Sequence, residues 1–408
     1  MPFCRLLCLR LKNSREAIEI NRNQEENDME AYFDNAATTA VFPEVKDLMV
    51  KLLTEDYGNP SSLHMKGVEA EKYIKKAAEQ IAREIKCQEK ELVFTSGGTE
   101  SNNLAIIGGA LAHRRAGKHI ITTNIEHASV SAAMDFLSKE GYEITCVGVD
   151  STGRINLDEL KNALCEDTIL VSTMYVNNEI GTIEPIEDIS KIIKAFNPKI
   201  LYHVDAVQAF GKLRFSPKKL GVDLLSMSGH KIHGPKGSGA LYIKEKTLIR
   251  PIIYGGGQQK EMRSGTENVP AIAGMGLAAE LMYKGNEEKV AHMLSLKNYL
   301  IEQLEALPEV YSNSGDAPHI ASISFTGVRS EVMLHALEER GIYVSAGSAC
   351  SSNRPHISNV LQAIGLPKDR LESTLRFSFC EDNTKEQVEY AVEVIREFLP
   401  MLRRYVRK

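Results

Sequence analysis

The chain has 408 residues, of which 43% are hydrophobic and 25% are charged, and its formal net charge is −5. This length exceeds what one hydrophobic core usually supports, so we expect two domains. The acidic balance argues against nucleic acid as a partner, and no apolar run is long enough to span a membrane. The seven cysteines are scattered without a Cys-x-x-Cys pair. This spacing argues against a disulfide framework or a zinc motif and favours a cytoplasmic location.

Residues 1–28 differ in composition from the rest of the chain. Residues 4–11 are basic and apolar, whereas residues 21–28 are entirely polar. A secretory signal needs a longer apolar core, and the acidic Glu16 and Glu19 count against a mitochondrial presequence. The codons of residues 24–26 can form a purine-rich stretch that resembles a ribosome-binding site. We therefore expect translation to start at Met29, with residues 1–28 a start-site artefact or a disordered extension.

A turn at residues 95–103 has the first pattern that is typical of a binding site. The strand expected at residues 91–94 leads into Gly97-Gly98-Thr99, and a helix follows. A glycine pair at a helix N-terminus lets backbone N–H groups approach a phosphate, and Thr99 can add its hydroxyl. The alternative is an ordinary helix cap, where threonine is also favoured.

From residue 119 onward strands and helices alternate, which predicts an α/β domain with a mostly parallel sheet. The strands are expected at residues 119–123, 143–149, 169–174, 200–204 and 222–226. Ligands of such sheets bind at the carboxyl ends of the strands. Four polar residues follow these ends: His127, Asn178, Asp205 and Gln208. A single histidine or aspartate there is more often a packed residue or a helix cap, so the argument rests on their convergence at one edge.

The segment Ser228-Gly229-His230-Lys231 follows the last of these strands. A desolvated lysine loses its proton more easily and can form a Schiff base with an aldehyde cofactor. Ser228 and His230 can form hydrogen bonds with a cofactor phosphate. The alternative is a solvent-exposed lysine in a turn, which is the common environment of lysine.

These features together fit one cofactor, pyridoxal phosphate. The lysine binds its aldehyde, and the aspartate keeps the pyridine nitrogen protonated, so that the ring can accept electrons. An imidazole can stack on the ring, an amide can bind the ring oxygen, and the glycine turn can bind the phosphate. The sequence therefore predicts a pyridoxal phosphate site at the carboxyl edge of the sheet.

Two glycine-rich loops follow the sheet, at residues 254–259 and 262–268. In the simpler interpretation they are flexible surface turns. In the other, Arg263 and Thr266 reach a phosphate or a substrate, and this contact can cross a dimer interface.

The C-terminal part predicts a second, smaller α/β domain at residues 287–408, after a large domain at residues 43–286 and a helical stretch at 271–304. Residues 29–42 are expected to join the small domain. Cys350 lies in a run of small residues and is either an exposed nucleophile or an incidental surface thiol. Arg376, on an expected strand, can bind a carboxylate with two hydrogen bonds or form a structural salt bridge.

The chain resembles the cysteine desulfurases of the NifS/IscS type, which are fold-type I pyridoxal phosphate enzymes of the class-V aminotransferase family. The resemblance runs from residue 31 to the C-terminus. It rests on five segments in the same order, namely residues 33–39, 95–103, 228–231, 263–266 and 347–350. It implies a large domain with a mostly parallel seven-stranded sheet and a smaller C-terminal α/β domain.

The resemblance also implies a role for each candidate residue. The implied catalytic residues are Cys350, Lys231 and His127. Besides Lys231 and His127, the implied cofactor ligands are Gly98, Thr99, Asn178, Asp205, Gln208, Ser228, His230 and Thr266, the last from the partner subunit of a homodimer. The implied substrate ligands are Asn178, Arg263 and Arg376.

The implied reaction removes sulfur from L-cysteine and gives L-alanine and a persulfide on Cys350. The persulfide then donates its sulfur to an acceptor protein such as an iron–sulfur scaffold, or to thio-cofactor or tRNA synthesis. Any metal contact of Cys350 is then a transient one with an iron–sulfur cluster. The identity of the acceptor stays open.

Two other classes stay open as well. One is a related pyridoxal enzyme, either a selenocysteine lyase, which would not need Cys350, or an aminotransferase-like protein. The other is a non-catalytic sulfur carrier or assembly partner, which would not need Lys231 and would show no cofactor absorbance.

Overall fold

The computed structural model describes residues 29–346 and 358–406. The expected N-terminal extension and the predicted nucleophile Cys350 therefore lie outside the described residues. A seven-stranded sheet forms the centre of the larger part, in the order β2-β8-β7-β6-β5-β3-β4, and only β8 is antiparallel to its neighbours. The strands are β2 (Leu92–Thr95), β3 (His119–Thr123), β4 (Glu143–Val147), β5 (Thr168–Met174), β6 (Leu201–Asp205), β7 (Leu224–Ser228) and β8 (Gly239–Ile243).

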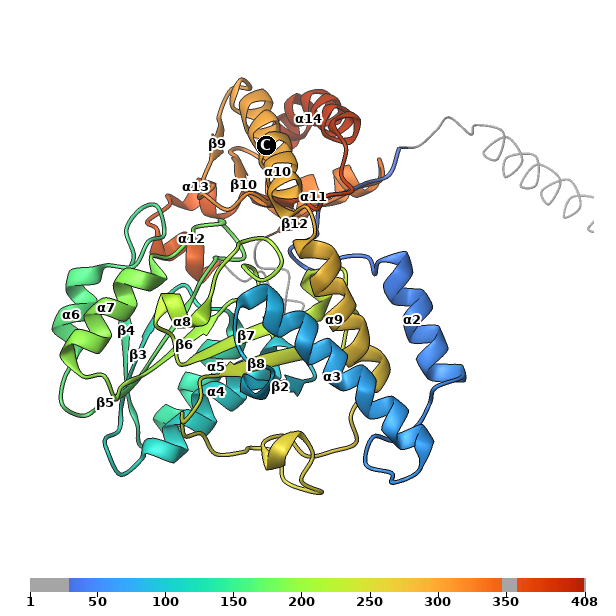
Figure 1. The fold of residues 1–408 in the computed structure, drawn as a ribbon. Helices are drawn as coiled ribbons and strands as arrows, with labels where there is room; N and C mark the ends of the chain where they lie inside the picture. Colours follow the sequence, from blue (N-terminus) through green and yellow to red (C-terminus); the bar gives the residue numbers. More distant parts are fainter. Residues whose placement is uncertain (1–28, 347–357, 407–408) are drawn as a thin grey trace, which may run out of the picture.

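Helices cover both faces of this sheet (Figure 1). On one face lie α4 (Gly98–His113) and α5 (Ala128–Lys139). The other face is covered by α3 (Met65–Ile85), α6 (Leu157–Ala163), α7 (Ile186–Phe196) and α9 (Val269–Tyr283), and α2 (Pro43–Thr54) packs against α9. Helix α7 illustrates why these helices pack on the sheet. Its apolar residues Ile186, Ile189 and Ile193 recur at helical spacing, so they share one face and are buried together. Short helical turns complete this part, namely η1 (Glu89–Glu91), α8 (Pro217–Leu220), η2 (Gly229–Lys231) and η3 (Gln259–Glu261).

A second core lies at the opposite end of the molecule from the labelled α3 and α4 (Figure 1). Its antiparallel sheet has the order β12-β13-β10-β9. The strands are β9 (Val310–Ser312), β10 (Ile320–Phe325), β12 (Ser345–Ala346) and β13 (Thr374–Ser378), and the helices are α10 (Asn286–Glu305), α11 (Ser330–Glu338), α12 (Asn359–Ala363), α13 (Lys368–Leu371) and α14 (Lys385–Val406). The predicted fold class is confirmed.

The N-terminal strand β1 (Ala31–Tyr32) pairs in parallel with β11 (Ile342–Tyr343), and Ala31 and Phe33 are buried in the second core.

The predicted domain limits stay a proposal, which the two separate cores support. The helical stretch expected at residues 271–304 is formed by two helices, α9 and α10, which Gly285, with φ +67°, separates. Among the helices of residues 29–346 and 358–406, none has the length and apolar character that a membrane crossing requires.

The strand directions decide where the site lies. Strands β2, β3, β5, β6 and β7 all run the same way, so their carboxyl ends share one edge of the sheet. The predicted site residues that follow these strands therefore lie at that edge of the sheet.

Candidate active site

The start of α4 and the end of β7 form a candidate anion site. Gly97 precedes α4 without a side-chain cap, so the first N–H groups of the helix have no intrahelical partner. A Cβ at Gly98 would lie 2.7 Å from Val207 Cγ2 and 3.7 Å from Ser228 Cβ, so only glycine leaves this approach open. Ser228 is 1% exposed, and its Oγ has no hydrogen-bond partner among the described residues. An uncapped helix N-terminus beside a buried, unused hydroxyl fits the phosphate of pyridoxal phosphate.

Thr99 and His230 lie next to this anion site. Thr99 is exposed in the first turn of α4, and His230 lies in η2, directly after β7. The Nδ1 atom of His230 is 3.3 Å from Thr38 Oγ1. Burial, together with the Lys231 ammonium group, lowers the pKa of His230 to about 4. The imidazole is therefore neutral near pH 7 and can act there as a hydrogen-bond partner without a charge.

The Lys231 amine is held against the segment that follows β1. Its Nζ donates hydrogen bonds to the carbonyl oxygens of Ala36 and Ala37, the latter at 2.7 Å. A second buried lysine, Lys212, donates to the Lys231 carbonyl. Burial and the Lys231 ammonium group lower the pKa of Lys212 to about 7. Two amines thus lie close together, and only Lys231 was predicted.

A chain of hydrogen bonds joins His127 to Asp205. Asn102 Nδ2 donates to Asp205 Oδ2 at 2.8 Å and to Ser129 Oγ at 2.9 Å. Ser129 Oγ lies 2.8 Å from His127 Nδ1, and the backbone N–H of Val207 donates to Asp205 Oδ1 at 3.0 Å. The carboxylate and the imidazole are therefore oriented by one network, although they come from β6 and from the N-cap of α5.

This network determines which nitrogen of His127 carries the proton. The backbone N–H of Ser129 can only donate, and it points to His127 Nδ1 at 3.1 Å. Nδ1 is therefore the acceptor, and Nε2 carries the N–H of the neutral ring. Burial lowers the pKa of His127; the Asp205 carboxylate raises it, the Lys231 ammonium lowers it again, and the net shift is downward. His127 retains exposed surface.

We expect Ser129→Ala to alter His127 without removing it. The Ser129 hydroxyl donates to Nδ1 and so stabilises the neutral ring, which means that its loss should raise the pKa of His127. One buried hydrogen bond corresponds to about 1 kcal/mol, so kcat should fall about fivefold. Ring ¹H–¹⁵N NMR titration measures the pKa directly. Ser129→Thr keeps the hydroxyl and should keep both values; an unchanged His127 pKa in Ser129→Ala would contradict the assignment.

Gln208 shares a backbone acceptor with the lysine. Its Nε2 donates to the Ala36 carbonyl at 2.9 Å, the same oxygen that Lys231 Nζ contacts. Its Oε1 lies 3.4 Å from His319 Nε2. The side chain is thus fixed beside Lys231, and its second amide hydrogen stays available for a ring oxygen.

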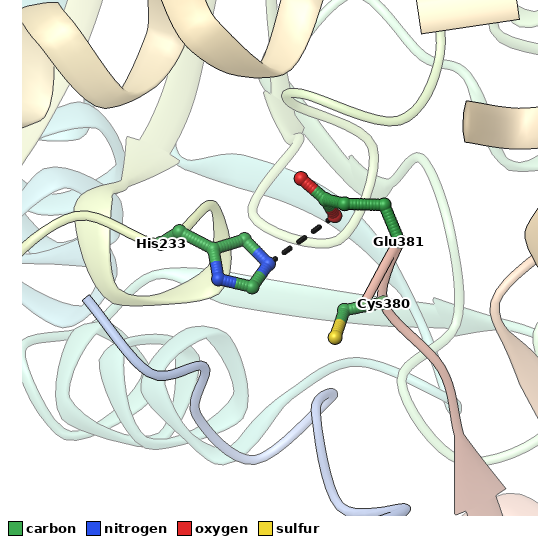
Figure 2. Close-up of side chains that lie close together, drawn as sticks. All are labelled: His233, Cys380 and Glu381. Atoms are coloured by element: carbon green, nitrogen blue, oxygen red, sulfur yellow. Dashed lines mark ion pairs between the residues drawn. The ribbon is translucent and has the colours of Figure 1, made fainter. Parts of the chain in front are cut away.

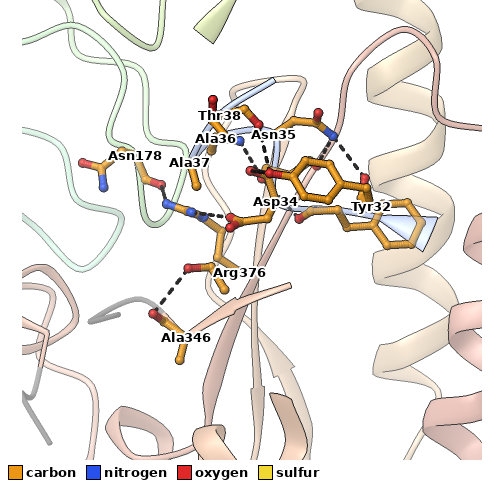
Figure 3. A network of polar contacts seen from close by, with 12 residues as sticks. Tyr32, Asp34, Asn35, Ala36, Ala37, Thr38, Asn178, Ala346 and Arg376 are labelled. Carbon is orange, nitrogen blue, oxygen red and sulfur yellow. Dashed lines mark hydrogen bonds and ion pairs between the residues drawn. The ribbon is translucent and has the colours of Figure 1, made fainter. Parts of the chain in front are cut away.

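Arg376, on β13 of the second core, lies at the same edge of the large sheet. Its Nη2 binds Asp34 Oδ1 at 2.7 Å, and its Nη1 donates to the Asn178 backbone carbonyl at 2.8 Å. Figure 3 shows the guanidinium between these two partners, with the side-chain amide of Asn178 directed away from it. A guanidinium has five N–H donors, so this pairing leaves donors for a substrate carboxylate.

The residues that flank the undescribed segment with Cys350 lie beside this arginine. Ser345 is paired with Arg376 across β12 and β13. On the other side, Ser358 caps α12 and donates from Oγ to Glu179 Oε2 at 2.5 Å. Both ends of the segment are therefore attached next to the Arg376 site, one at Arg376 itself and the other at the residue after Asn178.

Arg263 lies in a loop that is attached to α4. Its Nε binds Glu100 Oε1 at 2.8 Å, and its Nη2 binds Glu100 Oε2 at 3.3 Å. Burial raises the pKa of Glu100, but the Arg263 guanidinium and the hydrogen bonds from Ser96 together outweigh it, and the net shift is downward. Thr266, three residues later, is exposed. The substrate role of Arg263 and the role of Thr266 across a dimer interface stay predictions.

Sequence reasoning missed Asn102, Ser129 and Asp34. Asn102 lies one helical turn after Gly98 on α4, and Ser129 lies two residues after the N-cap His127, so their spacing was a usable signal. Asp34 offered no such signal, because its partner Arg376 is 342 residues away.

The family profile described as aminotransferase class-V matches residues 31–391. The chain belongs to the class-V aminotransferase family. The cysteine desulfurase IscS of Dictyoglomus turgidum is 45% identical over 378 residues, which are 92% of this chain and 95% of that protein. The corresponding IscS of Methanosarcina thermophila is 44% identical over 91% of this chain and 92% of that protein.

Solved structures agree with these relatives. A NifS-like protein superposes with a TM-score of 0.87 at 40% identity, covering 92% of this chain and all (100%) of that one. A structure of SspA in complex with cysteine superposes with a TM-score of 0.76 at 35% identity, covering 87% of this chain and all (100%) of that one. The predicted family, fold and cofactor, pyridoxal phosphate, are confirmed.

Proposed function

We propose that this protein is a cysteine desulfurase that removes the sulfur atom from L-cysteine and releases L-alanine. The observation that carries the proposal is the meeting of three groups at one sheet edge: Lys231, Asp205 and the anion site at Gly98 and Ser228. Arg376 reaches the same edge from the second core. The relatives named for cysteine desulfurase activity, and the cysteine complex of SspA, support this choice of substrate.

The position of each side chain suggests its role in the reaction. When bound, pyridoxal phosphate supplies an electron-withdrawing ring that acidifies the Cα–H of an amino acid. The Lys231 amine would hold the cofactor and could take up the Cα proton, Asp205 would pair with the ring nitrogen, and His127 would stack on the ring. Arg376 holds the substrate carboxylate and so orients the Cα–H bond toward Lys231. The Nε2–H of His127 is placed to give a hydrogen bond or a proton.

Sulfur transfer then needs a nucleophile, for which we propose the Cys350 thiolate. As the S–S bond forms between Cys350 and the substrate sulfur, the C–S bond of cysteine breaks. The thiol proton of Cys350 ends in the methyl group of alanine, so cysteine plus enzyme thiol gives alanine plus enzyme persulfide in balance. The attachment of both flanks of this segment near Arg376 supports the assignment.

The persulfide is proposed to pass its sulfur to an acceptor protein, such as an iron–sulfur scaffold, in the cytoplasm. A homodimer is proposed as well. The exposed position of Thr266 is compatible with a contact from one subunit to the phosphate of the other.

A visible absorption spectrum of the purified protein, before and after L-cysteine, tests this function. We expect a yellow protein whose colour changes with cysteine and which forms alanine and transferable sulfur one to one. A colourless protein that pyridoxal phosphate cannot reconstitute would overturn the proposal and favour a sulfur carrier.

A further inference from the structure

A second group of reactive side chains lies beside the turn that carries Lys231. His233, Cys380 and Glu381 each direct one potential metal-binding atom inward, and these atoms lie within 4.8 Å of one another. Figure 2 shows the imidazole directed at the carboxylate, with the Cys380 sulfur beside them. His233 comes two residues after Lys231, whereas Cys380 comes two residues after the end of β13 and is followed by Glu381. None of the proposed steps of desulfuration uses these three residues.

The orientation of His233 is held by its other nitrogen. Its Nδ1 lies 2.8 Å from the carbonyl oxygen of Ala40, which can only accept, so Nδ1 carries a hydrogen. The Phe42 ring stacks on the imidazole, with 4.4 Å between centroids and 19° between planes. In the neutral ring the Nε2 lone pair then points toward Glu381. A histidine held by a backbone carbonyl at one nitrogen is the usual arrangement of a metal ligand.

The Nε2 atom faces Glu381 Oε2 at 3.3 Å. His233 is 2% exposed, and neither Nε2 nor either Glu381 oxygen has an aligned hydrogen bond among the described residues. Two lone pairs at this distance repel unless a positive charge lies with them, either a proton on Nε2 or a metal ion. Tetrahedral ligands of Zn²⁺ with bonds of 2.0–2.1 Å are separated by about 3.3 Å, the distance found here.

Cys380 completes a ligand set of nitrogen, oxygen and sulfur. It is 9% exposed, and its backbone N–H is held by Asn383 Oδ1 at 2.9 Å. Burial raises the pKa of the Cys380 thiol to about 12, so without a metal the thiol stays protonated. A bound divalent ion displaces that proton to solvent, and the thiolate and carboxylate together then balance its two charges. This combination of ligands favours Zn²⁺ or Co²⁺ over Mg²⁺ or Ca²⁺.

Two lysines face the same group and oppose a cation. Lys289 Nζ lies 3.6 Å from Glu381 Oε1, on the oxygen that does not face His233. Lys212, which is buried, is near Glu381 and Cys380. One carboxylate oxygen thus stays directed at the group. The Glu381 side chain is 11% exposed, which provides an entry path for an ion.

We propose that His233, Cys380 and Glu381 bind a divalent transition-metal ion of the zinc class. The site links the turn after Lys231, in the large core, to the end of the strand that carries Arg376, in the second core. A bound ion clamps these two segments together and stabilises the folded enzyme. The proposal does not depend on the proposed function, because it concerns neither the cofactor nor the substrate.

Titration with Co²⁺ tests the site in the pyridoxal phosphate-loaded enzyme that carries Cys350→Ala, so that Cys350 contributes no thiolate. We expect one Co²⁺ per chain by equilibrium dialysis and ligand-field bands in the red part of the spectrum, where the cofactor does not absorb. Cys380→Ser in this background should shift and weaken the bands and lower the affinity at least tenfold. Cys146→Ser, at an exposed cysteine of β4, is the matched control and should change neither.

Two further variants keep the proposal testable if Cys380→Ser folds poorly. Glu381→Gln and His233→Gln retain the side-chain size, and each should lower Co²⁺ affinity at least tenfold. Co²⁺ should raise the melting temperature of the parent and of Cys146→Ser, but of none of the three site variants. Less than one bound Co²⁺ per chain, or full retention of the bands in Cys380→Ser and Glu381→Gln, would overturn the site. The group would then be a protonated His233 paired with Glu381.

Discussion

The Lys231→Ala variant should fold but lose at least about 1,000-fold in kcat for alanine formation from L-cysteine. The reaction needs an amine at this position, and no other described amine lies between Ala36, Ala37 and the end of β7. The neighbouring Lys212 donates to the Lys231 carbonyl and cannot take its place without moving the turn. The variant should also fail to retain pyridoxal phosphate covalently, which borohydride reduction followed by mass spectrometry detects.

Lys236→Ala is the matched control, since this lysine lies in the same loop and is exposed. It should retain the labelled cofactor and the activity. If Lys231→Ala kept either the reduced cofactor adduct or more than a few per cent of the activity, the assignment of Lys231 would be wrong.

The second large effect is expected for Cys350→Ala. The cofactor spectrum should be unchanged, because the residues proposed to bind the cofactor are intact. Alanine and persulfide formation from L-cysteine should fall at least about 100-fold, since the nucleophile for the sulfur atom is gone. Alkylation of the persulfide followed by mass spectrometry should place the transferred sulfur on Cys350 in the parent.

This variant also separates the alternatives. Cys165→Ala, at an exposed cysteine of the large domain, is the control and should keep full activity. A Cys350→Ala enzyme that still cleaves selenocysteine while failing on cysteine is expected of a desulfurase. Undiminished release of sulfur from cysteine would instead contradict the proposed nucleophile and favour a lyase.

Much of this site could be predicted from local sequence. Gly98, Asp205, Ser228 and Lys231 each follow a recognisable apolar strand, and the alternation of strands and helices predicts that such ends share one edge. The structure places these residues there. The prediction succeeded because strand direction in a parallel sheet follows from the connections between consecutive elements, which are local along the chain.

Only the tertiary structure decided which distant residues touch. Asn102 and Asp205 are 103 positions apart, and Asp34 and Arg376 are 342 apart. The packing of two cores against each other brings such pairs together. The hydrophobic periodicity of a single segment does not predict which distant segment it packs against. The same holds for His233 with Cys380 and Glu381. The local sequence thus determined the turn that carries Lys231 and the turn at Gly98. The tautomer of His127, the partners of Arg376 and the proposed metal site depend instead on contacts that exist only in the folded chain.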